Sequence, residues 1–169
     1  MSMLERETDE RYELWSGEKI VLPLCGTDHE SIFSNLTGLM VQHVRNNKLG
    51  KVFGSNTAVF LHGDVTRKEF RLPDVSFVAT ERLDRVQHKG IFGAPDLLVE
   101  IVSPGKKYAD RDLIEKFAVY EQFGVTEYWI VKPYVEEMEL YHLRDGKYVR
   151  VEQSILFAGI QLAHEEIFE

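Results

Sequence analysis

The sequence predicts an α/β fold in which a mixed central β-sheet is flanked by helices. Apolar residues recur at helical spacing after residue 27 and again after residue 108. Several segments between and after these stretches are rich in β-branched and aromatic residues and end in turn signals. One of them, residues 96–102, is an almost continuous apolar run, which is typical of a central strand covered on both faces.

The first part of the chain is expected to form two strands and a long helix. Residues 10–24 have the pattern of two short strands around a turn at Ser16–Gly17. Thr27 and Glu30 have the spacing of a capping box, and apolar residues follow at helical spacing. We therefore expect a helix that begins at residue 27 and ends near residue 47.

Strands dominate the middle of the chain. One is expected over residues 51–61, either continuous or broken at Gly54, and another over residues 70–79, where Pro73 marks a strand start or an edge. Residues 80–95 are polar and rich in glycine and charge, so we expect a loop between this strand and the central one.

The last part is expected to begin with a second helix from residue 108 to residue 123, ended by Gly124. Three strands follow, the last two joined by a hairpin turn at Asp145–Gly146: residues 127–131, 138–143 and 148–151. The strands near the N- and C-termini are expected as additions to the restricted set of core strands.

The size and composition indicate one domain over residues 1–169, because 169 residues support a single core but hardly two. The charged residues 1–9 lack the apolar stretch of a signal peptide, so we expect a frayed N-terminus there. No apolar stretch approaches the roughly 18 residues of a membrane span. The single cysteine, Cys25, is typical of a reduced compartment, and we expect a cytoplasmic protein.

Two carboxylates are the first candidates for chemistry. Glu100 lies within the apolar central strand, where an acidic side chain is costly unless it is paired, hydrogen-bonded or bound to a metal. Asp74 begins the preceding strand, and the 26 residues between them (100 − 74 = 26) suffice for a loop and a return along a neighbouring strand. Such a pair can share a hard cation such as Mg²⁺. The plain alternatives are a salt bridge for Glu100 and a turn for Asp74.

Lys116 is the third candidate, because a helical wheel places it on the apolar face of the second helix, opposite Arg111 and Glu115. From there its ammonium group could lie beside the two carboxylates, and could stabilise charge on a phosphate or orient an attacking water. The alternatives are a side chain that extends outward to solvent or an ordinary helical pair with Asp112.

Five further residues are supporting candidates, and the first is Asp112, one helical turn before Lys116. Asp96 begins the central strand on the same side as Glu100, so it either contributes to a metal environment or caps the strand. Glu30 is explained by the capping box. His29 lies on the apolar side of the first helix, where a hydrogen-bonded core histidine is a simpler reading than a ligand. Ser103 ends the central strand.

The net charge of the chain affects which molecules it can bind. A net charge of −8 argues against a broadly basic surface of the kind that grips duplex DNA. The most basic segment is the expected loop over residues 80–95, which could reach a phosphate backbone or could simply be solvated. Its basic residues are Arg82, Arg85, His88 and Lys89.

An ordered series of motifs over about residues 10–165 resembles the restriction endonuclease family called Uma-two, in the PD-(D/E)XK nuclease superfamily. The motifs that carry the resemblance are Pro73–Val75, Ala94–Leu97, Val99–Pro104, Asp112, Lys116, Tyr120, Gly124–Val125 and Glu127–Val131. The resemblance implies a restriction-endonuclease-like fold with its site on the second and third core strands. It also implies Mg²⁺- or Mn²⁺-dependent hydrolysis of phosphodiester bonds in a nucleic acid, with DNA as the expected partner.

Position by position, the resemblance matches Asp74 to the first metal carboxylate and Glu100 to the acidic residue of the third strand. The superfamily's lysine two residues after that carboxylate is missing, because position 102 is valine. Lys116 matches the helical position from which such families are thought to supply the lysine. The sequence hypothesis is therefore a bacterial nuclease in which Asp74 and Glu100 hold the metal and Lys116 assists.

Two other functions compete with this hypothesis. The acidic balance and Val102 favour a nuclease-like domain that has lost catalysis and serves as a binding or assembly module. A small-molecule or metal-binding protein on the same fold is the third class. A homodimer is a further expectation, because nucleases that cut both strands commonly act in pairs and an exposed hairpin edge could join two chains.

Overall fold

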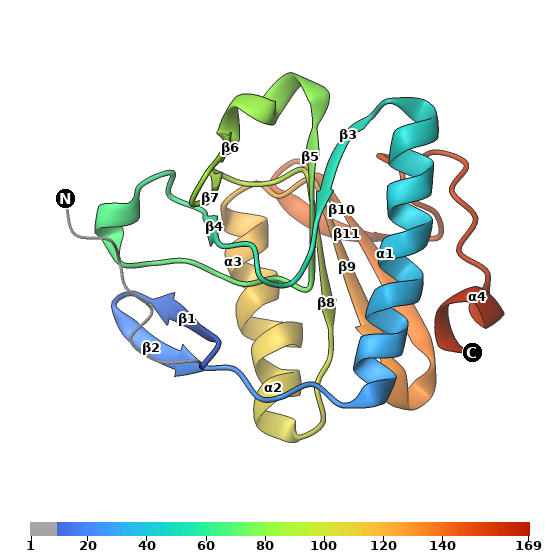
Figure 1. Cartoon of the computed structure of the whole chain (residues 1–169), viewed down its shortest axis with the longest axis horizontal. Coiled ribbons are helices and arrows are strands. Elements are labelled where there is room, and N and C mark those ends of the chain that lie inside the picture. Colours follow the sequence, from blue (N-terminus) through green and yellow to red (C-terminus); the bar gives the residue numbers. More distant parts are fainter. Residues whose placement is uncertain (1–9) are drawn as a thin grey trace.

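A six-stranded mixed sheet forms the centre of the molecule, in the strand order β11-β10-β9-β8-β5-β3 (Figure 1). The computed structural model describes residues 10–169, apart from the side chains of Lys106, Lys107 and Asp112. The frayed N-terminus expected over residues 1–9 thus lies outside the described residues. β8 and β9 are parallel, and the other neighbouring pairs are antiparallel. The predicted mixed sheet is confirmed, with these strands: β3 (Gly50–Phe53), β5 (Val75–Ala79), β8 (Leu97–Ile101), β9 (Glu127–Lys132), β10 (Glu137–Arg144) and β11 (Lys147–Val151).

Helix α1 (Thr27–Asn47) covers one face of this sheet, as its apolar spacing predicted. Its buried stripe packs against inward-facing residues of β5, β8 and β9: Ile32, Leu36, Met40 and Val44 meet Val75, Phe77, Val99 and Trp129. The predicted capping box is wrong, because the N-cap is Gly26 and no side chain caps the helix. The Glu30 carboxylate instead lies 3.4 Å from Nδ1 of His29.

The opposite face is covered by one helical stretch of three parts: α2 (Lys106–Asp110), a π-helical turn (Arg111–Glu115) and α3 (Lys116–Gln122). It begins two residues before the predicted start. In the π turn the amide of Lys116 donates to the carbonyl of Arg111, five residues earlier. The wider turn places both side chains toward the sheet. Arg111 is therefore buried, and the helical wheel was wrong about its side of the helix.

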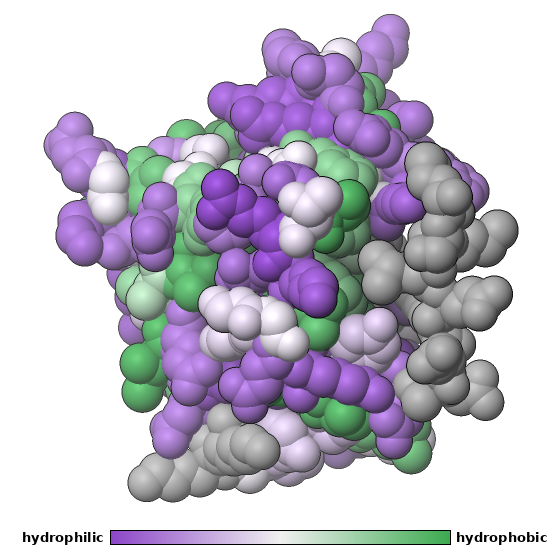
Figure 2. Space-filling model, turned by 90° about the vertical axis from the view of Figure 1, so that its left-hand side faces the viewer, coloured by the Kyte–Doolittle hydropathy of each residue, from purple (hydrophilic) through white to green (hydrophobic). Residues whose placement is uncertain are grey.

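Two smaller sheets flank the central one. β1 (Tyr12–Trp15) and β2 (Glu18–Val21) form the predicted N-terminal hairpin. β4 (Val59–Phe60), β7 (Gly90–Phe92) and β6 (Val86–Gln87) form a three-stranded sheet. The predicted strand over residues 51–61 is thus divided at Gly54 between two sheets. Figure 2 shows that this side of the molecule is largely hydrophilic, with smaller apolar areas between.

The prediction of a loop over residues 80–95 is wrong, since the segment contains a 3₁₀ turn (Thr80–Arg85) and strands β6 and β7. These strands are two and three residues long and carry no alternating pattern. They are fixed by tertiary contact instead: Ile91 is fully buried and pairs with Val59. Within the described residues no helix combines the length and apolarity needed to cross a bilayer.

Glu127, at the start of β9, anchors the C-terminal segment to the core. Its buried carboxylate accepts hydrogen bonds from the amides of Ile155 (2.6 Å) and Leu156 (2.9 Å) and from the hydroxyl of Ser154 (2.7 Å). These bonds place Phe157 in the core beneath α1. The last helix, α4 (His164–Phe168), then lies beside α1.

Replacing Glu127 with alanine should therefore be strongly destabilising. Glu127→Ala leaves two amides and a hydroxyl without their acceptor in the interior, at a cost of about 1–3 kcal/mol for each unsatisfied group. We expect a loss of at least about 3 kcal/mol in the free energy of unfolding, measured by urea denaturation. The exposed neighbour Glu152 provides the control, Glu152→Ala, which should change stability by less than about 0.5 kcal/mol. Equal effects of the two variants would contradict the anchoring role.

Candidate active site

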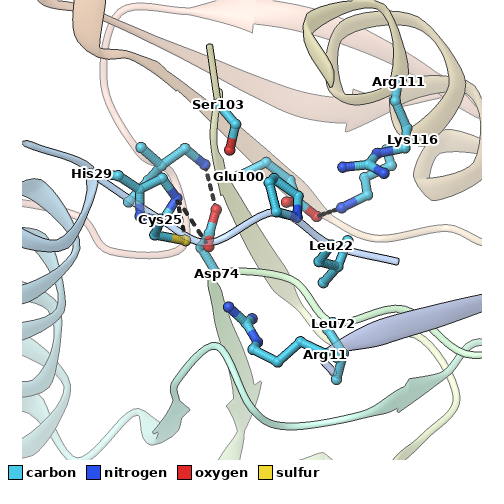
Figure 3. A pocket seen from close by; sticks show the side chains of 12 residues that line it. Arg11, Leu22, Cys25, His29, Leu72, Asp74, Glu100, Ser103, Arg111 and Lys116 are labelled. Carbon is cyan, nitrogen blue, oxygen red and sulfur yellow. Dashed lines mark hydrogen bonds and ion pairs between the residues drawn. The ribbon is translucent and has the colours of Figure 1, made fainter. Parts of the chain in front are cut away.

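A small pocket lies where the beginning of α1 meets the start of β5, the end of β8 and the π turn of the second helix (Figure 3). It brings together five sequence candidates: Asp74, Glu100, Lys116, His29 and Ser103. Its volume is about 30 Å³. This is room for an ion with about one water, since one water needs about 10–15 Å³ on this measure. The pocket is much too small for a nucleotide.

Asp74 and Glu100 face each other because of the register between β5 and β8. Val75 pairs with Val99 in this antiparallel ladder, so the positions just beyond them, 74 and 100, are opposite. Both side chains are buried. The amide of Ile101 donates to Oδ2 of Asp74 at 2.7 Å and fixes that carboxylate against the neighbouring strand.

Lys116 is buried between two carboxylates. Its Nζ lies 2.8 Å from Oε1 of Glu100 and 3.1 Å from Oε1 of Glu13, and its side chain is only 3% exposed. The predicted alternative of a lysine that extends to solvent is therefore wrong. The hydroxyl of Tyr120, one turn later on α3, donates to the same Glu100 oxygen at 2.8 Å. Burial, followed by the charge of Glu100, raises the pKa of Tyr120 well above its usual value, so the phenol remains a donor.

Glu13 is a member of this cluster that sequence reasoning missed. It is fully buried on β1 and accepts hydrogen bonds from the amide of Leu72 and from Nε1 of Trp15, both at 2.9 Å. Burial alone would raise the pKa of Glu13, but the charge of Lys116 and these hydrogen bonds outweigh it, so the pKa is lowered. Glu13 is thus charged at neutral pH. In the sequence it is an acidic residue in a short strand with no apolar run around it, which gives no sign of burial.

His29 joins the pocket through Asp74. Its Nε2 lies 3.4 Å from Oδ1 of Asp74, while Nδ1 lies 3.4 Å from Glu30. Burial would lower the pKa of His29. The hydrogen bond and charge of Asp74, with the charge of Glu30, outweigh this and raise it. The ring is therefore more readily protonated than a free imidazole.

Two predicted site residues take no visible part in the pocket. Asp96 accepts a hydrogen bond from the amide of Ala79 at 2.8 Å and pairs with Arg82, so it joins β8 to the 3₁₀ turn after β5. It serves as a strand-end cap, the second of its two predicted roles. The side chain of Asp112 lies outside the described part of the chain, and its predicted pairing with Lys116 stays a prediction.

The most basic segment of the sequence, residues 80–95, lies away from the pocket. Residues 80–95 connect the end of β5 to the start of β8, whereas Asp74 precedes β5 and Glu100 is near the end of β8. The segment is therefore at the opposite end of both strands. Two of its basic side chains also have internal partners, since Arg82 pairs with Asp96 and Arg85 donates to the carbonyl of Ala94.

Two arginines that the sequence did not single out line the pocket instead. Arg11 stands before β1 and donates to the carbonyl of Ser55 at 2.7 Å, and Arg111 is brought in by the π turn. With Lys116 they bring positive charge to the pocket in a chain whose net charge is −8. No simple sequence pattern marks a π turn, so Arg111 could not have been placed from the helical spacing.

The donor set suits a hard cation. Two carboxylates from adjacent strands face each other across a pocket of about 30 Å³, and Mg²⁺ is typically held by one or two carboxylates with several waters. The buried lysine adds a positive charge at the edge of the same space. Such an arrangement can bind a cation and a phosphate oxygen side by side.

Comparison with known proteins identifies the fold and the family of the chain. The crystal structure of "a putative nuclease belonging to DUF820" from Anabaena variabilis ATCC 29413 matches the fold with a TM-score of 0.73 and 17% sequence identity, over 96% of this chain and 92% of that chain. At this identity the likeness shows the fold. No curated protein matches the chain in sequence. The family model described as "Putative restriction endonuclease" matches residues 1–169, and the chain therefore belongs to the Uma2 family.

Proposed function

We propose that this chain is a Mg²⁺- or Mn²⁺-dependent endonuclease that hydrolyses phosphodiester bonds of DNA, acting in the bacterial cytoplasm. One observation carries the proposal. The carboxylates of Asp74 and Glu100 face each other across adjacent strands, and Lys116 is buried against Glu100 in the same small pocket. A buried acid–base cluster of this kind is costly to the fold, which makes a functional role its best explanation.

Asp74 and Glu100 would hold the metal. When bound, Mg²⁺ supplies polarisation of a phosphate oxygen and a water of lowered pKa. The chain's own contribution is to fix the two carboxylates before any ligand arrives: the amide of Ile101 holds Asp74, and the hydroxyl of Tyr120 holds Glu100. Fixed ligands need little rearrangement when the cation binds.

Lys116 would offset negative charge that develops on the phosphate. Its ammonium is already desolvated, so its interaction with a phosphate oxygen would be stronger than that of an exposed lysine. Glu13 is the positioning residue, because its Oε1 lies 3.1 Å from the ammonium group and helps to hold it beside Glu100.

The DNA would bind at the surface beside the pocket and would not enter it. A space of about 30 Å³ admits a phosphate oxygen at most, so the sugar and base must stay at the surface. Arg11 and Arg111 line the pocket and would contact the phosphate. With a net charge of −8 there is little other attraction for DNA, so we expect weak binding whose salt dependence reflects only the few phosphate contacts of these side chains.

A catalytically silent binding module is the second candidate. It is favoured by the double pairing of Lys116, whose charge is offset twice, by Glu13 and by Glu100. A silent module would keep the cluster as a structural core and would show no metal-dependent cleavage of any substrate.

A homodimer belongs to the proposal as well. Strand β11 is at the edge of the central sheet and exposes Val149, so two copies could pair there and present two pockets to the two DNA strands. Sedimentation velocity should then give twice the chain mass of 19.6 kDa. A monomer at all concentrations would remove this part of the proposal.

The metal site is tested by calorimetric titration of Mg²⁺ and Mn²⁺ into the protein. Asp74→Ala and Glu100→Gln should each abolish binding, because either change removes one of two carboxylate ligands. Asp84→Asn, at an exposed aspartate outside the pocket, is the matched control and should bind as the unmodified protein does. Binding that survives both site substitutions would refute the assignment.

Cleavage of supercoiled plasmid tests the lysine. Lys116→Met keeps the length of the side chain and removes its charge, and we expect kcat to fall by about 10²–10³ with far-UV circular dichroism unchanged. Cleavage by Lys116→Met at the unmodified rate would exclude a catalytic role for the ammonium group.

Glu13→Gln tests the positioning role through pH. The lowered pKa of Glu13 means that its ionisation stabilises the fold above its ordinary pKa of 4.5, and that this stabilisation is lost as the pH falls through the lower folded value. The stability difference between Glu13→Gln and the unmodified protein should therefore be largest near pH 7 and should shrink below pH 4.5 in urea denaturation. A difference that does not change with pH would contradict the pairing with Lys116.

A further inference from the structure

A second, larger cavity opens at the surface next to the candidate active site. Its volume is about 450 Å³, which lies within the roughly 300–1,000 Å³ of small-molecule sites. Its walls come from the first turn of α1, the end of β8, the 3₁₀ turn Pro133–Val135 and the end of α4. The cavity is therefore large enough for a group that the first pocket excludes.

The two cavities are adjacent, because neighbouring residues of the chain line them in turn. Ser103 lines the first, whereas Val102 and Pro104 line the second. Before α1, Cys25 lines the first and Gly26 the second. Consecutive Cα atoms are about 3.8 Å apart. One extended molecule can therefore reach both cavities.

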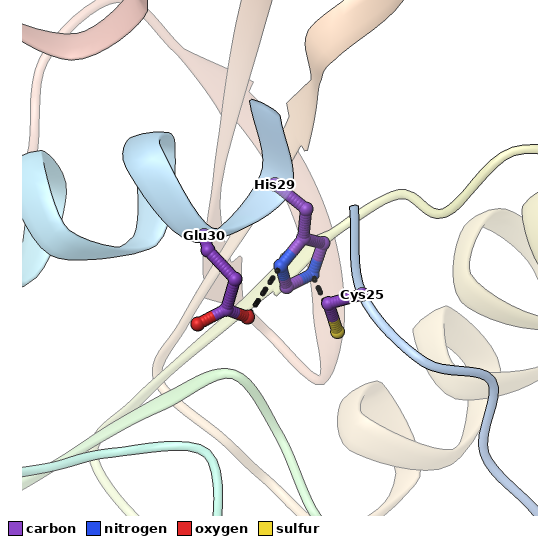
Figure 4. Close-up of side chains that lie close together, drawn as sticks. All are labelled: Cys25, His29 and Glu30. Carbon is purple, nitrogen blue, oxygen red and sulfur yellow. Dashed lines mark hydrogen bonds and ion pairs between the residues drawn. The ribbon is translucent and has the colours of Figure 1, made fainter. Parts of the chain in front are cut away.

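The imidazole ring of His29 belongs to the wall of both cavities. Figure 4 shows Cys25 and Glu30 at opposite nitrogens of this ring. Sγ of Cys25 lies 4.0 Å from Nε2, and Oε1 of Glu30 lies 3.4 Å from Nδ1. The side chain of His29 is only 7% exposed. The ring is thus held in place, and a molecule that occupies both cavities must place a different group in each.

The second cavity offers apolar surfaces on which a flat ring can stack. Tyr134 is 65% exposed at its edge, and the next residue, Val135, is 61% exposed. Val102 and Pro104 add further apolar surface to the lining. Aromatic side chains that are open to solvent serve as stacking platforms for nucleobases of any sequence. The shape and surface of the cavity therefore suit an unpaired base.

The charge of the second cavity excludes phosphate. Its described lining includes the acidic Asp28, Glu136 and Glu169 but no lysine or arginine, whereas two arginines and a lysine line the first pocket. Carboxylates accept hydrogen bonds from the exocyclic amino groups of bases. Glu136 lies 3.2 Å from Nε2 of His164, but a carboxylate has about four acceptor positions. Phosphate and base are thus directed to different cavities.

We propose that the second cavity binds a base of the DNA strand whose phosphate lies at the candidate active site, with the base stacked on Tyr134 and its amino group held by Asp28 or Glu136. This inference rests on the proposed function, because the metal site places the phosphate. A base that is paired within a duplex cannot enter, and turning it out of the stack costs free energy. The preferred substrate is therefore DNA with an unpaired, amino-bearing base beside the cleaved bond.

Stacking is tested by the fluorescence anisotropy of a short labelled oligodeoxycytidine at low ionic strength in EDTA, where no metal-dependent cleavage occurs. Tyr134→Leu should weaken binding at least about fivefold, and Tyr134→Phe, which keeps the ring, should stay within about twofold of the unmodified protein. Ile155→Ala is the control, because it removes an exposed apolar side chain at the opposite end of β9, where the amide of Ile155 contacts Glu127. Unchanged binding by Tyr134→Leu, or an equal loss in Ile155→Ala, would overturn the stacking role.

Recognition of the amino group is tested by comparing oligodeoxycytidine with oligodeoxyuridine, since the two bases differ by an amino and an oxo group at one ring position. The unmodified protein should prefer cytosine at least about fivefold, and the double variant Asp28→Ala, Glu136→Ala should prefer it less than about twofold. The control removes the same charge at two exposed acidic residues outside the cavity, Asp84→Ala with Glu152→Ala, and should keep the preference. Equal affinity of the unmodified protein for both oligonucleotides would overturn this recognition.

Failure of the base site and failure of the proposed function are distinguishable. A cytosine preference without metal binding or cleavage would overturn the nuclease and leave a site for single-stranded DNA. Metal-dependent cleavage whose kcat and KM are the same in Tyr134→Leu and the unmodified protein would overturn the base site and leave the nuclease. Free deoxycytidine that binds as tightly as the oligonucleotide would assign the cavity to a nucleoside and overturn its role toward DNA.

Discussion

The buried ammonium group of Lys116 is the constraint on which the rest of the site depends. It joins three parts of the chain that are far apart in the sequence: α3, the central strand β8 through Glu100, and the N-terminal hairpin through Glu13. Removing any one of the three charges would leave the others unbalanced in a poorly solvated interior, which costs several kcal/mol. The hairpin is therefore as much a part of the site as the sheet is.

Most of the fold could be predicted from periodicity. The stripe on α1 and the apolar run of β8 are long signals, and they correctly placed a helix and a covered central strand. Residues 80–95 could not be predicted, because strands of two or three residues form through tertiary contact with β4 and carry no pattern of their own. The capping box was wrong because spacing alone does not form one: Gly26 is the N-cap of the helix, and the carboxylate of Glu30 lies beside His29.

Parts of the candidate site could be predicted because the free-energy cost of burying a charged side chain is visible in the sequence. A glutamate in an apolar strand and a lysine on an apolar helix face each cost free energy unless the charge is paired. The structure pairs them, with Nζ of Lys116 2.8 Å from Oε1 of Glu100. The sequence around Glu13 gives no sign that this residue is buried. Its burial comes from the docking of the hairpin on residues about 60 to 100 positions away. Arg111 was placed on the wrong side because one π turn changes the helical phase.

The pairing of Glu13 with Lys116 also determines when the pocket can be complete. The two residues are 103 positions apart (116 − 13 = 103), so during synthesis the carboxylate leaves the ribosome long before the ammonium group that balances it. Until Lys116 is available, the charged carboxylate of Glu13 is most stable in water, and docking of the hairpin would bury that charge without a partner. Contacts of such long sequence separation form late in folding. A growing chain would therefore have no assembled pocket. The pocket would become accessible to nucleic acids only after Glu13 and Lys116 have paired in the folded chain.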